Sequence, residues 1–116
     1  MKNKSQACGG PLDVLLNGET GNYTAKLQEL KHMATNYHKS EQYSKIIDFA
    51  ISAAQRLKYS PEDLRIFQDL YIERGMTVRI ISEKNYMNIR TVYKRVNAVF
   101  KELMPIVYGV DGIKFN

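Results

Sequence analysis

Three polar residues divide the C-terminal half of this 116-residue chain into three short helices. Ser60, Thr77 and Asn88 each precede a run in which apolar residues recur at helical spacing. Side chains of these types accept hydrogen bonds from the first free backbone N–H groups of a helix. Pro61 strengthens the first start, because proline at the first helical position loses no hydrogen bond. We therefore expect three helices after residue 60.

Breakers and apolar spacing set the bounds of these helices. The first is expected to end before Gly75, because glycine commonly closes a helix. The second is expected over residues 78 to about 84, and the third from the residue after the Asn88 cap to about residue 103, with Pro105 stopping it. A three-residue turn, 85–87, then separates the second helix from the third.

The residues before position 59 also divide by their pattern. Residues 1–22 hold four glycines and show no sustained periodicity, so we expect a flexible arm there. Helical spacing begins at Tyr23 and resumes near Ser40, which predicts two helices between residues 23 and 58. The second of them carries a wide apolar stripe that must be buried. The stripe consists of Tyr43, Ile46, Ile47, Ala50, Ile51, Ala54 and Leu57.

Positive charge is concentrated in one part of the chain. The whole chain has a formal net charge of +5. Residues 77–101 contain six basic residues and one acidic residue, whereas residues 61–76 contain two basic and four acidic residues. The surplus therefore lies on the last two predicted helices, where a polyanion such as nucleic acid would meet it.

Residues 77–96 have the layout of a helix-turn-helix. Ile81 and Met87 stand where the first helix and the turn insert apolar groups into a core. Ser82 is small enough to let the second helix approach closely. The inner face of the second helix is apolar and would hold it against the core. That face consists of Val92, Val96, Val99 and Leu103.

The outer face of the last helix carries the candidate DNA contacts. A recognition helix meets base edges in the major groove with residues near its N-terminal end. The base-edge candidates are Ile89, Arg90, Tyr93, Lys94 and Asn97. Residues towards the flanks would meet phosphate groups instead. The phosphate candidates are Thr77, Arg79, Thr91, Arg95 and Lys101.

Four segments carry a resemblance to a known family: 60–63 (SPED), 71–73 (YIE), 77–79 (TVR) and 90–96 (RTVYKRV). Together they resemble region four of bacterial sigma factors, which recognises promoter DNA. The order of helical N-terminal portion, sigma-like helix-turn-helix and short tail is similar to phage late-gene transcriptional regulators of the ArpU and RinA type. The resemblance implies that the chain binds double-stranded DNA, makes RNA polymerase a candidate partner and implies activation of late genes.

The turn departs from the family pattern. Tyr86 stands where the family usually has glycine, and Asn85 where an apolar residue is usual. A left-handed backbone is tolerated better by Asn than by Tyr. We therefore expect Asn85 to take the left-handed conformation of the turn.

The predicted fold is all-α and has four parts. They are a flexible arm (1–22), a helical N-terminal portion (23–58), a helix-turn-helix DNA-binding portion (59–104) and a short non-helical tail (105–116). Within the tail, the pair Asp111-Gly112 favours a tight reversal.

Composition narrows the class of protein. Apolar runs are only a few residues long and no signal-peptide core occurs, so we expect a cytoplasmic protein without membrane association. Cys8 is the only cysteine and has no partner for a disulfide or a metal pair. His32 and His38 fall on different helical faces without a neighbouring acidic pair. We expect no enzyme activity, cofactor or metal site.

Two other functions remain open at this point. The apolar stripe and the eight tyrosines would also suit a helical protein-interaction module that binds no DNA. A small-terminase-like DNA-packaging protein would share the helix-turn-helix but form rings. We also expect a homo-oligomer, because one recognition helix covers only a few base pairs. Its favoured interface is the apolar tail, with Ile106, Val107, Tyr108, Val110, Ile113 and Phe115.

Overall fold

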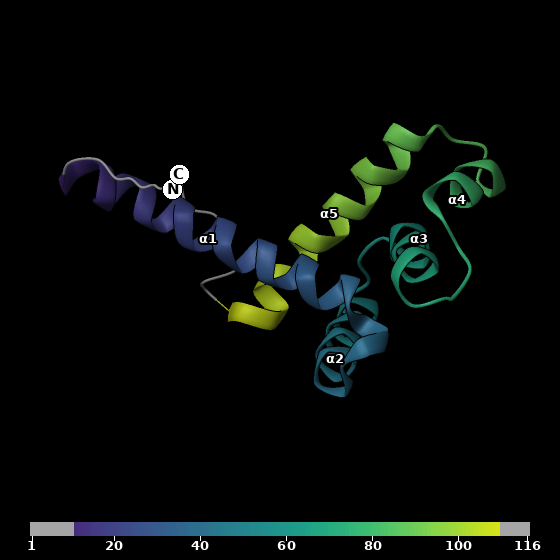
Figure 1. Ribbon diagram of the computed structural model, residues 1–116, viewed down its shortest axis with the longest axis horizontal. Coiled ribbons are helices and arrows are strands. Elements are labelled where there is room, and N and C mark those ends of the chain that lie inside the picture. Colours follow the sequence, from purple (N-terminus) through teal and green to yellow (C-terminus); the bar gives the residue numbers. More distant parts are fainter. Residues whose placement is uncertain (1–10, 110–116) are drawn as a thin grey trace.

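The computed structural model describes the backbone of residues 11–109 and the side chains of residues 22–109. Five α-helices and one short 3₁₀ helix make up this part of the chain, and it contains no strand (Figure 1). The all-α prediction is confirmed. The elements are α1 (Pro11–Thr35), η1 (Tyr37–Lys39), α2 (Glu41–Arg56), α3 (Pro61–Tyr71), α4 (Val78–Lys84) and α5 (Ile89–Tyr108).

Side-chain caps start four of these helices. Ser60, Thr77 and Asn88 accept hydrogen bonds from backbone N–H groups three residues further on, as the sequence predicts. Ser40 does the same at the start of α2. Each cap satisfies a backbone group that the helix itself leaves without a partner. Local sequence therefore sets the N-terminal ends of α2 to α5.

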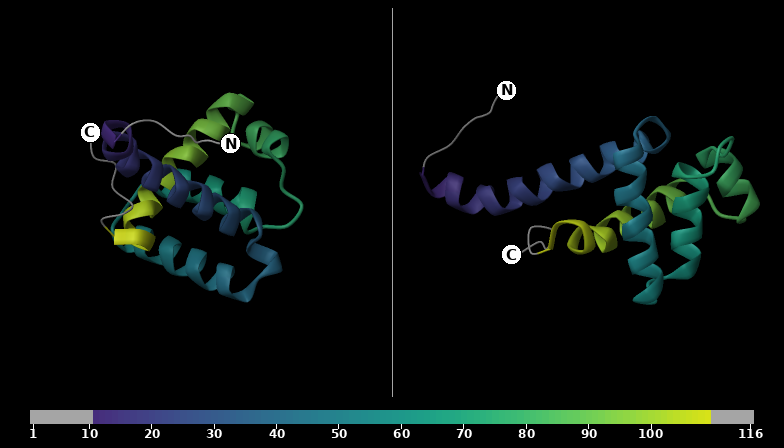
Figure 2. Two further views of the ribbon diagram at one scale, coloured as in Figure 1. Left: turned by 60° about the vertical axis from the view of Figure 1, so that its left-hand side comes forward. Right: turned by 90° about the horizontal axis from the view of Figure 1, so that it is seen from below.

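Helix α5 is the element around which the others assemble. It packs against α1, α2, α3 and α4, and Figure 2 shows it running along the body of the molecule. Phe67 of α3 and Phe100 of α5 meet edge to face with ring centroids 5.0 Å apart, and Tyr71 completes the aromatic group. Aromatic pairs in this geometry stabilise a core beyond the area they bury.

The apolar stripe of α2 lies in this core. Ile47, Ala50, Ile51 and Ala54 are buried, which confirms the prediction for the middle of the stripe. Leu57, at its end, is exposed. Leu30, Met33 and Ala34 of α1 are buried in the same cluster, so α1 and α2 cover the core together. The buried apolar residues of α1 and α2 are Leu30, Met33, Ala34, Ile47, Ala50, Ile51 and Ala54.

The start of α1 differs from the prediction. The helix begins at Pro11, so the expectation of a flexible arm is wrong for residues 11–22, which are helical. Pro11 suits a first helical position, and Gly18 and Gly21 each weaken a helix by only about 1 kcal/mol relative to alanine without breaking it. Residues 1–10, including Cys8, lie outside the described residues.

The end of α5 also differs from the prediction. The helix passes through Pro105 and ends at Tyr108, so residues 105–108 are not a non-helical tail. Proline removes one helical hydrogen bond, but packing against the core offsets this loss, because Ile106, Val107 and Tyr108 are all partly buried there. The predicted reversal at Asp111-Gly112 falls outside the described residues.

No helix within residues 11–109 combines the length and the apolar character that a membrane span requires.

Candidate nucleic-acid interface

The inner side of the helix-turn-helix is packed as the sequence predicts. Ile81 of α4 and Val92 and Val96 of α5 are buried. Ser82 is also buried, and its hydroxyl donates to the carbonyl oxygen of Arg79 at 2.9 Å. The small side chain is therefore satisfied within its own helix and adds no polar group to the contact with α5. The helical phase predicted for α5 is confirmed.

The turn between α4 and α5 takes a different backbone from the one predicted. Asn85 has a φ of −103°, and Tyr86 has a φ of +55°. The left-handed residue is thus Tyr86, and the prediction of Asn85 is wrong. Met87, partly buried, closes the turn with its backbone N–H on the carbonyl oxygen of Ser82.

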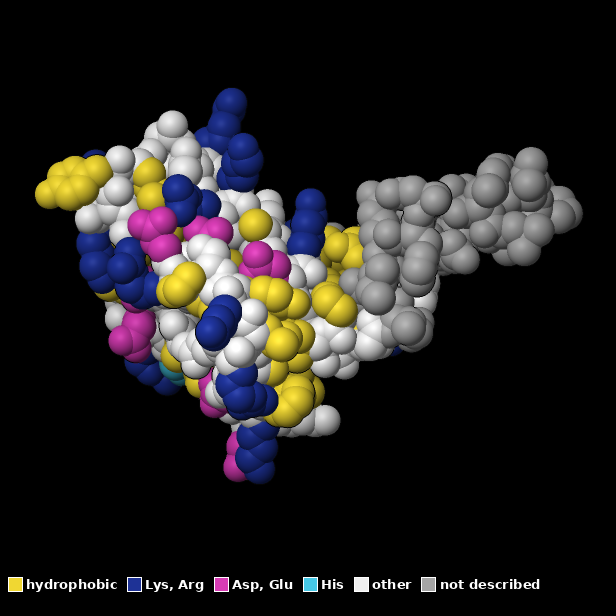
Figure 3. Space-filling view, turned by 180° about the vertical axis from the view of Figure 1, so that it is seen from behind, with side chains coloured by type: hydrophobic (Ala, Val, Ile, Leu, Met, Phe, Trp, Pro, Cys, Tyr) yellow, Lys and Arg dark blue, Asp and Glu magenta, His cyan; other side chains and the backbone are white. Residues whose placement is uncertain are grey.

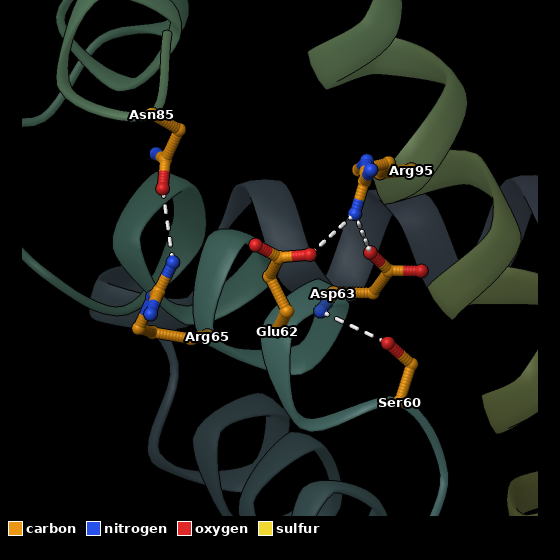
Figure 4. Close-up of polar contacts among 6 residues, drawn as sticks. All are labelled: Ser60, Glu62, Asp63, Arg65, Asn85 and Arg95. Atoms are coloured by element: carbon orange, nitrogen blue, oxygen red, sulfur yellow. Dashed lines mark hydrogen bonds and ion pairs between the residues drawn. The ribbon is translucent and has the colours of Figure 1, made fainter. Parts of the chain in front are cut away.

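The side chain of Asn85 explains this choice. Its amide nitrogen donates to the carbonyl oxygen of Ile81 at 2.8 Å. Its amide oxygen accepts a hydrogen bond from Arg65 of α3 at 2.9 Å (Figure 4). These two hydrogen bonds hold Asn85 between α3 and α4, and the left-handed conformation is taken by the next residue, Tyr86. Arg65 and Asn85 lie 20 residues apart, so no local pattern indicates this contact.

The outer face of α5 gathers the base-edge candidates on one open surface. Arg90, Tyr93, Lys94 and Asn97 line a shallow groove together with Ala98 and Lys101. Ile89, at the first turn of the helix, is 46% exposed, and Tyr93 is 53% exposed. The five base-edge candidates are therefore all accessible. Lys101, assigned to phosphates from the sequence, lines the same groove.

Three of the other phosphate candidates already have intramolecular partners. Thr77 caps α4, where its hydroxyl oxygen accepts from the backbone N–H of Ile80 at 3.2 Å. The Thr91 hydroxyl donates to the side-chain oxygen of Asn88 at 3.0 Å. Arg79 forms an ion pair of 3.6 Å with Glu83, and both side chains are well exposed. An exposed pair of this kind contributes little to stability and opens readily for another anion.

Arg95 occupies a different place from the other candidates. Its guanidinium donates to Glu62 at 2.7 Å and to Asp63 at 3.0 Å, which joins α5 to the first turn of α3 (Figure 4). The hydrogen bonds that Arg95 donates, first to Asp63 and then to Glu62, raise its pKa. We therefore assign Arg95 to holding the two helices together in the free protein, and its contact with phosphates stays a prediction.

A second cross-link supports the same part of the fold. Asp69 of α3 is buried, and one of its carboxylate oxygens lies 3.4 Å from the ammonium group of Lys84 in α4. Sequence reasoning counted Lys84 only as part of the basic surplus. The partner is 15 residues away, on another helix, so only the packing of α3 against α4 identifies it.

A second surface, which shares no residue with the α5 groove, is apolar. On the face shown in Figure 3, hydrophobic side chains gather in a patch with lysine and arginine side chains around it. Ile46 and Phe49 of α2 line a groove with Ile106 and Val107 of α5, and Phe49 is 60% exposed. The apolar residues predicted as an interface in the tail thus split between this groove and the core, as far as the described residues reach.

The comparison with known proteins identified no relative of this chain. No family model matches the chain, and no similar curated protein or solved structure was found.

Proposed function

We propose that this chain is a sequence-specific regulator of transcription that binds double-stranded DNA with α5 in the major groove. One observation carries the proposal. Arg90, Tyr93, Lys94 and Asn97 line a single open groove on α5, while the opposite face of the same helix is buried. A helix with one face fixed in a core and a polar, basic face left open has the form of a recognition helix.

The side chains of this groove suit base edges. Arginine and lysine donate to O6 and N7 of guanine, and asparagine pairs with N6 and N7 of adenine. Arg90, Lys94 and Asn97 supply these groups from successive turns of α5. Ile89 is apolar and exposed, which suits contact with the methyl group of thymine. Lys101 and Arg79 provide charge for the phosphates on either side.

The contacts that hold α5 in place favour a preorganised α5 groove. The Asn88 cap fixes the first turn of the helix, the Arg95 ion pairs join it to α3, and Asn85 joins the turn to α3. These contacts come from residues that do not line the groove. Little ordering of the backbone would then be needed on binding, and ordering is a cost that subtracts from affinity.

The test is selection of bound duplexes from a random library, followed by affinity measurements at several salt concentrations. We expect a defined sequence motif, and an affinity for random duplex DNA that falls steeply with salt as counterions are released from phosphates. Absence of binding to any duplex at low salt would contradict the proposal. The symmetry of the recovered motif also reports whether two copies bind together.

The more particular role, activation of phage late genes beside RNA polymerase, rests on the resemblance to sigma region four and to phage late-gene regulators of the ArpU and RinA type. Pull-down of RNA polymerase by the full chain, with and without the selected DNA, tests this role. We expect retention of polymerase to depend on the DNA site.

A protein-interaction module is the second candidate, and the exposed Phe49 is the observation that favours it. An aromatic side chain beside Ile46, Ile106 and Val107 offers a surface that a protein partner could cover. The two functions are compatible, because this groove and the basic groove of α5 share no residue.

A further inference from the structure

Tyr86 has a strained backbone and an exposed side chain, and neither feature stabilises the folded chain. Its φ of +55° places the backbone in the left-handed region, which costs energy for a residue with a large side chain. Its side chain is 97% exposed, so the ring has almost no contact with the rest of the molecule. A glycine would make the same turn without the strain. The tyrosine therefore destabilises the free protein, and a contact made in a complex would account for its presence.

The position of Tyr86 indicates which complex. It lies in the turn two residues before Asn88, the cap of α5. When a helix enters the major groove near its N-terminal end, the turn that leads into it lies beside the backbone of the strand that borders the groove. Tyrosine hydroxyls are among the groups that donate to DNA phosphates. The neighbouring Arg90 is exposed and favours an anionic partner.

We infer that Tyr86 contacts the sugar-phosphate backbone of duplex DNA, with its phenol O–H donating to a phosphate oxygen. This inference rests on the proposed function, because it takes α5 to be the recognition helix. Tyr86 then positions the protein on DNA of any sequence, and the residues of the α5 groove distinguish one sequence from another.

The experiment compares three variants with the wild-type chain on the selected duplex and on random duplex. Tyr86→Phe removes only the hydroxyl and keeps the backbone and the ring. Tyr86→Gly removes the ring and relieves the backbone. Lys58→Gly is the matched control, because Lys58 is also exposed, has a φ of +60° and lies between α2 and α3, where it lines no part of the α5 groove.

We expect both glycine variants to raise the melting temperature by roughly 2 to 5 °C, since each relieves a left-handed backbone. Tyr86→Gly should lower DNA affinity about tenfold for all sequences alike, the loss of one hydrogen bond to a charged group. Tyr86→Phe should show most of this tenfold decrease in affinity, without a change in melting temperature. Lys58→Gly should bind as the wild type does.

The salt dependence separates this contact from a lysine or arginine contact. A neutral phenol releases no counterion, so the slope of log affinity against log salt should stay unchanged in both Tyr86 variants. Wild-type affinity in Tyr86→Phe and Tyr86→Gly would overturn the inference and leave the proposed function standing. Normal DNA binding combined with loss of a protein partner would also overturn it, in favour of a protein contact. If the wild-type chain itself binds no duplex, the proposed function fails first.

Discussion

The two halves of α5 differ in what surrounds them. In residues 89–98, six side chains are exposed and only Val92 and Val96 are buried. In residues 99–108, Lys101 is the one exposed side chain, and four residues are buried. The second half also touches α1, where Tyr108 donates to Glu29 at 2.7 Å. One helix thus serves as a binding surface in its first half and as the centre of the core in its second.

This contrast implies that binding and stability can be altered separately. Substitutions in the exposed face of the first half should change affinity for a ligand and leave the fold intact. Substitutions in the second half should change stability and affect binding only through unfolding. Four predictions test this separation, beginning with the largest expected effect.

Phe100→Ala should lower the free energy of unfolding by about 3 to 5 kcal/mol, because the ring is buried against Phe67 and Tyr71. The matched control is Tyr93→Ala, which removes an exposed aromatic ring from the first half of α5. It should change the free energy of unfolding by less than about 0.5 kcal/mol. Urea unfolding of both variants measures the difference. Equal losses would show that the two halves do not differ as described.

Arg90→Ala and Lys94→Ala should each weaken binding to the selected duplex by roughly 1 to 3 kcal/mol, the range for a lost base contact. Their melting temperatures should match that of the wild type, since both side chains are exposed. Lys45→Ala removes a similar charge from α2 and serves as the control. Unchanged affinity in both groove variants would reject α5 as the recognition helix.

Arg95→Ala should lower the free energy of unfolding only slightly at low salt, because its two ion pairs are exposed to solvent. The loss should shrink as salt is added, since salt screens these charges. Unfolding at two salt concentrations measures this dependence. Wild-type stability of this variant, combined with a smaller slope of log affinity against log salt for DNA binding, would show that Arg95 contacts phosphates instead.

Glu102→Gln should raise the free energy of unfolding at neutral pH by up to about 1 kcal/mol. One carboxylate oxygen of Glu102 is buried without a hydrogen-bond partner among the described residues, and burial, followed by the nearby Asp63, raises the pKa of Glu102. The charged form therefore destabilises the fold.

The sign of the pH dependence follows from this shift. A carboxyl group with a raised pKa in the folded state binds its proton more readily there than in the unfolded chain, so its cost disappears as the pH falls. The difference between Glu102→Gln and the wild type should then shrink at acidic pH. Glu73→Gln, on an exposed side chain, is the control and should show no such trend.

Features of the fold that depend on neighbouring residues could be predicted from the sequence. The caps at Ser60, Thr77 and Asn88 and the burial of Val92 and Val96 follow from spacing alone, because a helix repeats every 3.6 residues. The exposure of the base-edge candidates follows from the same periodicity.

Features that depend on distant residues could not be predicted. The partners of Arg95 lie 32 and 33 residues away on α3, and Asn85, beside the turn, accepts a hydrogen bond from Arg65, 20 residues earlier. The helix continues past Pro105 into residues that pack against the core, and Tyr108 there contacts Glu29, 79 residues earlier in the chain. Local propensity is a weak guide wherever such contacts outweigh it.

The continuity of α5 has a mechanical consequence. At about 1.5 Å per residue, the part of α5 before Pro105 forms a rod of roughly 24 Å that carries the exposed face directly into the core. The angle at which the exposed half meets a duplex is then set by the orientation of the whole body. A second copy of the chain or a polymerase subunit that binds the rest of the protein would also fix that angle. In a dimer, the distance between the two α5 helices would set the spacing between half-sites in the DNA.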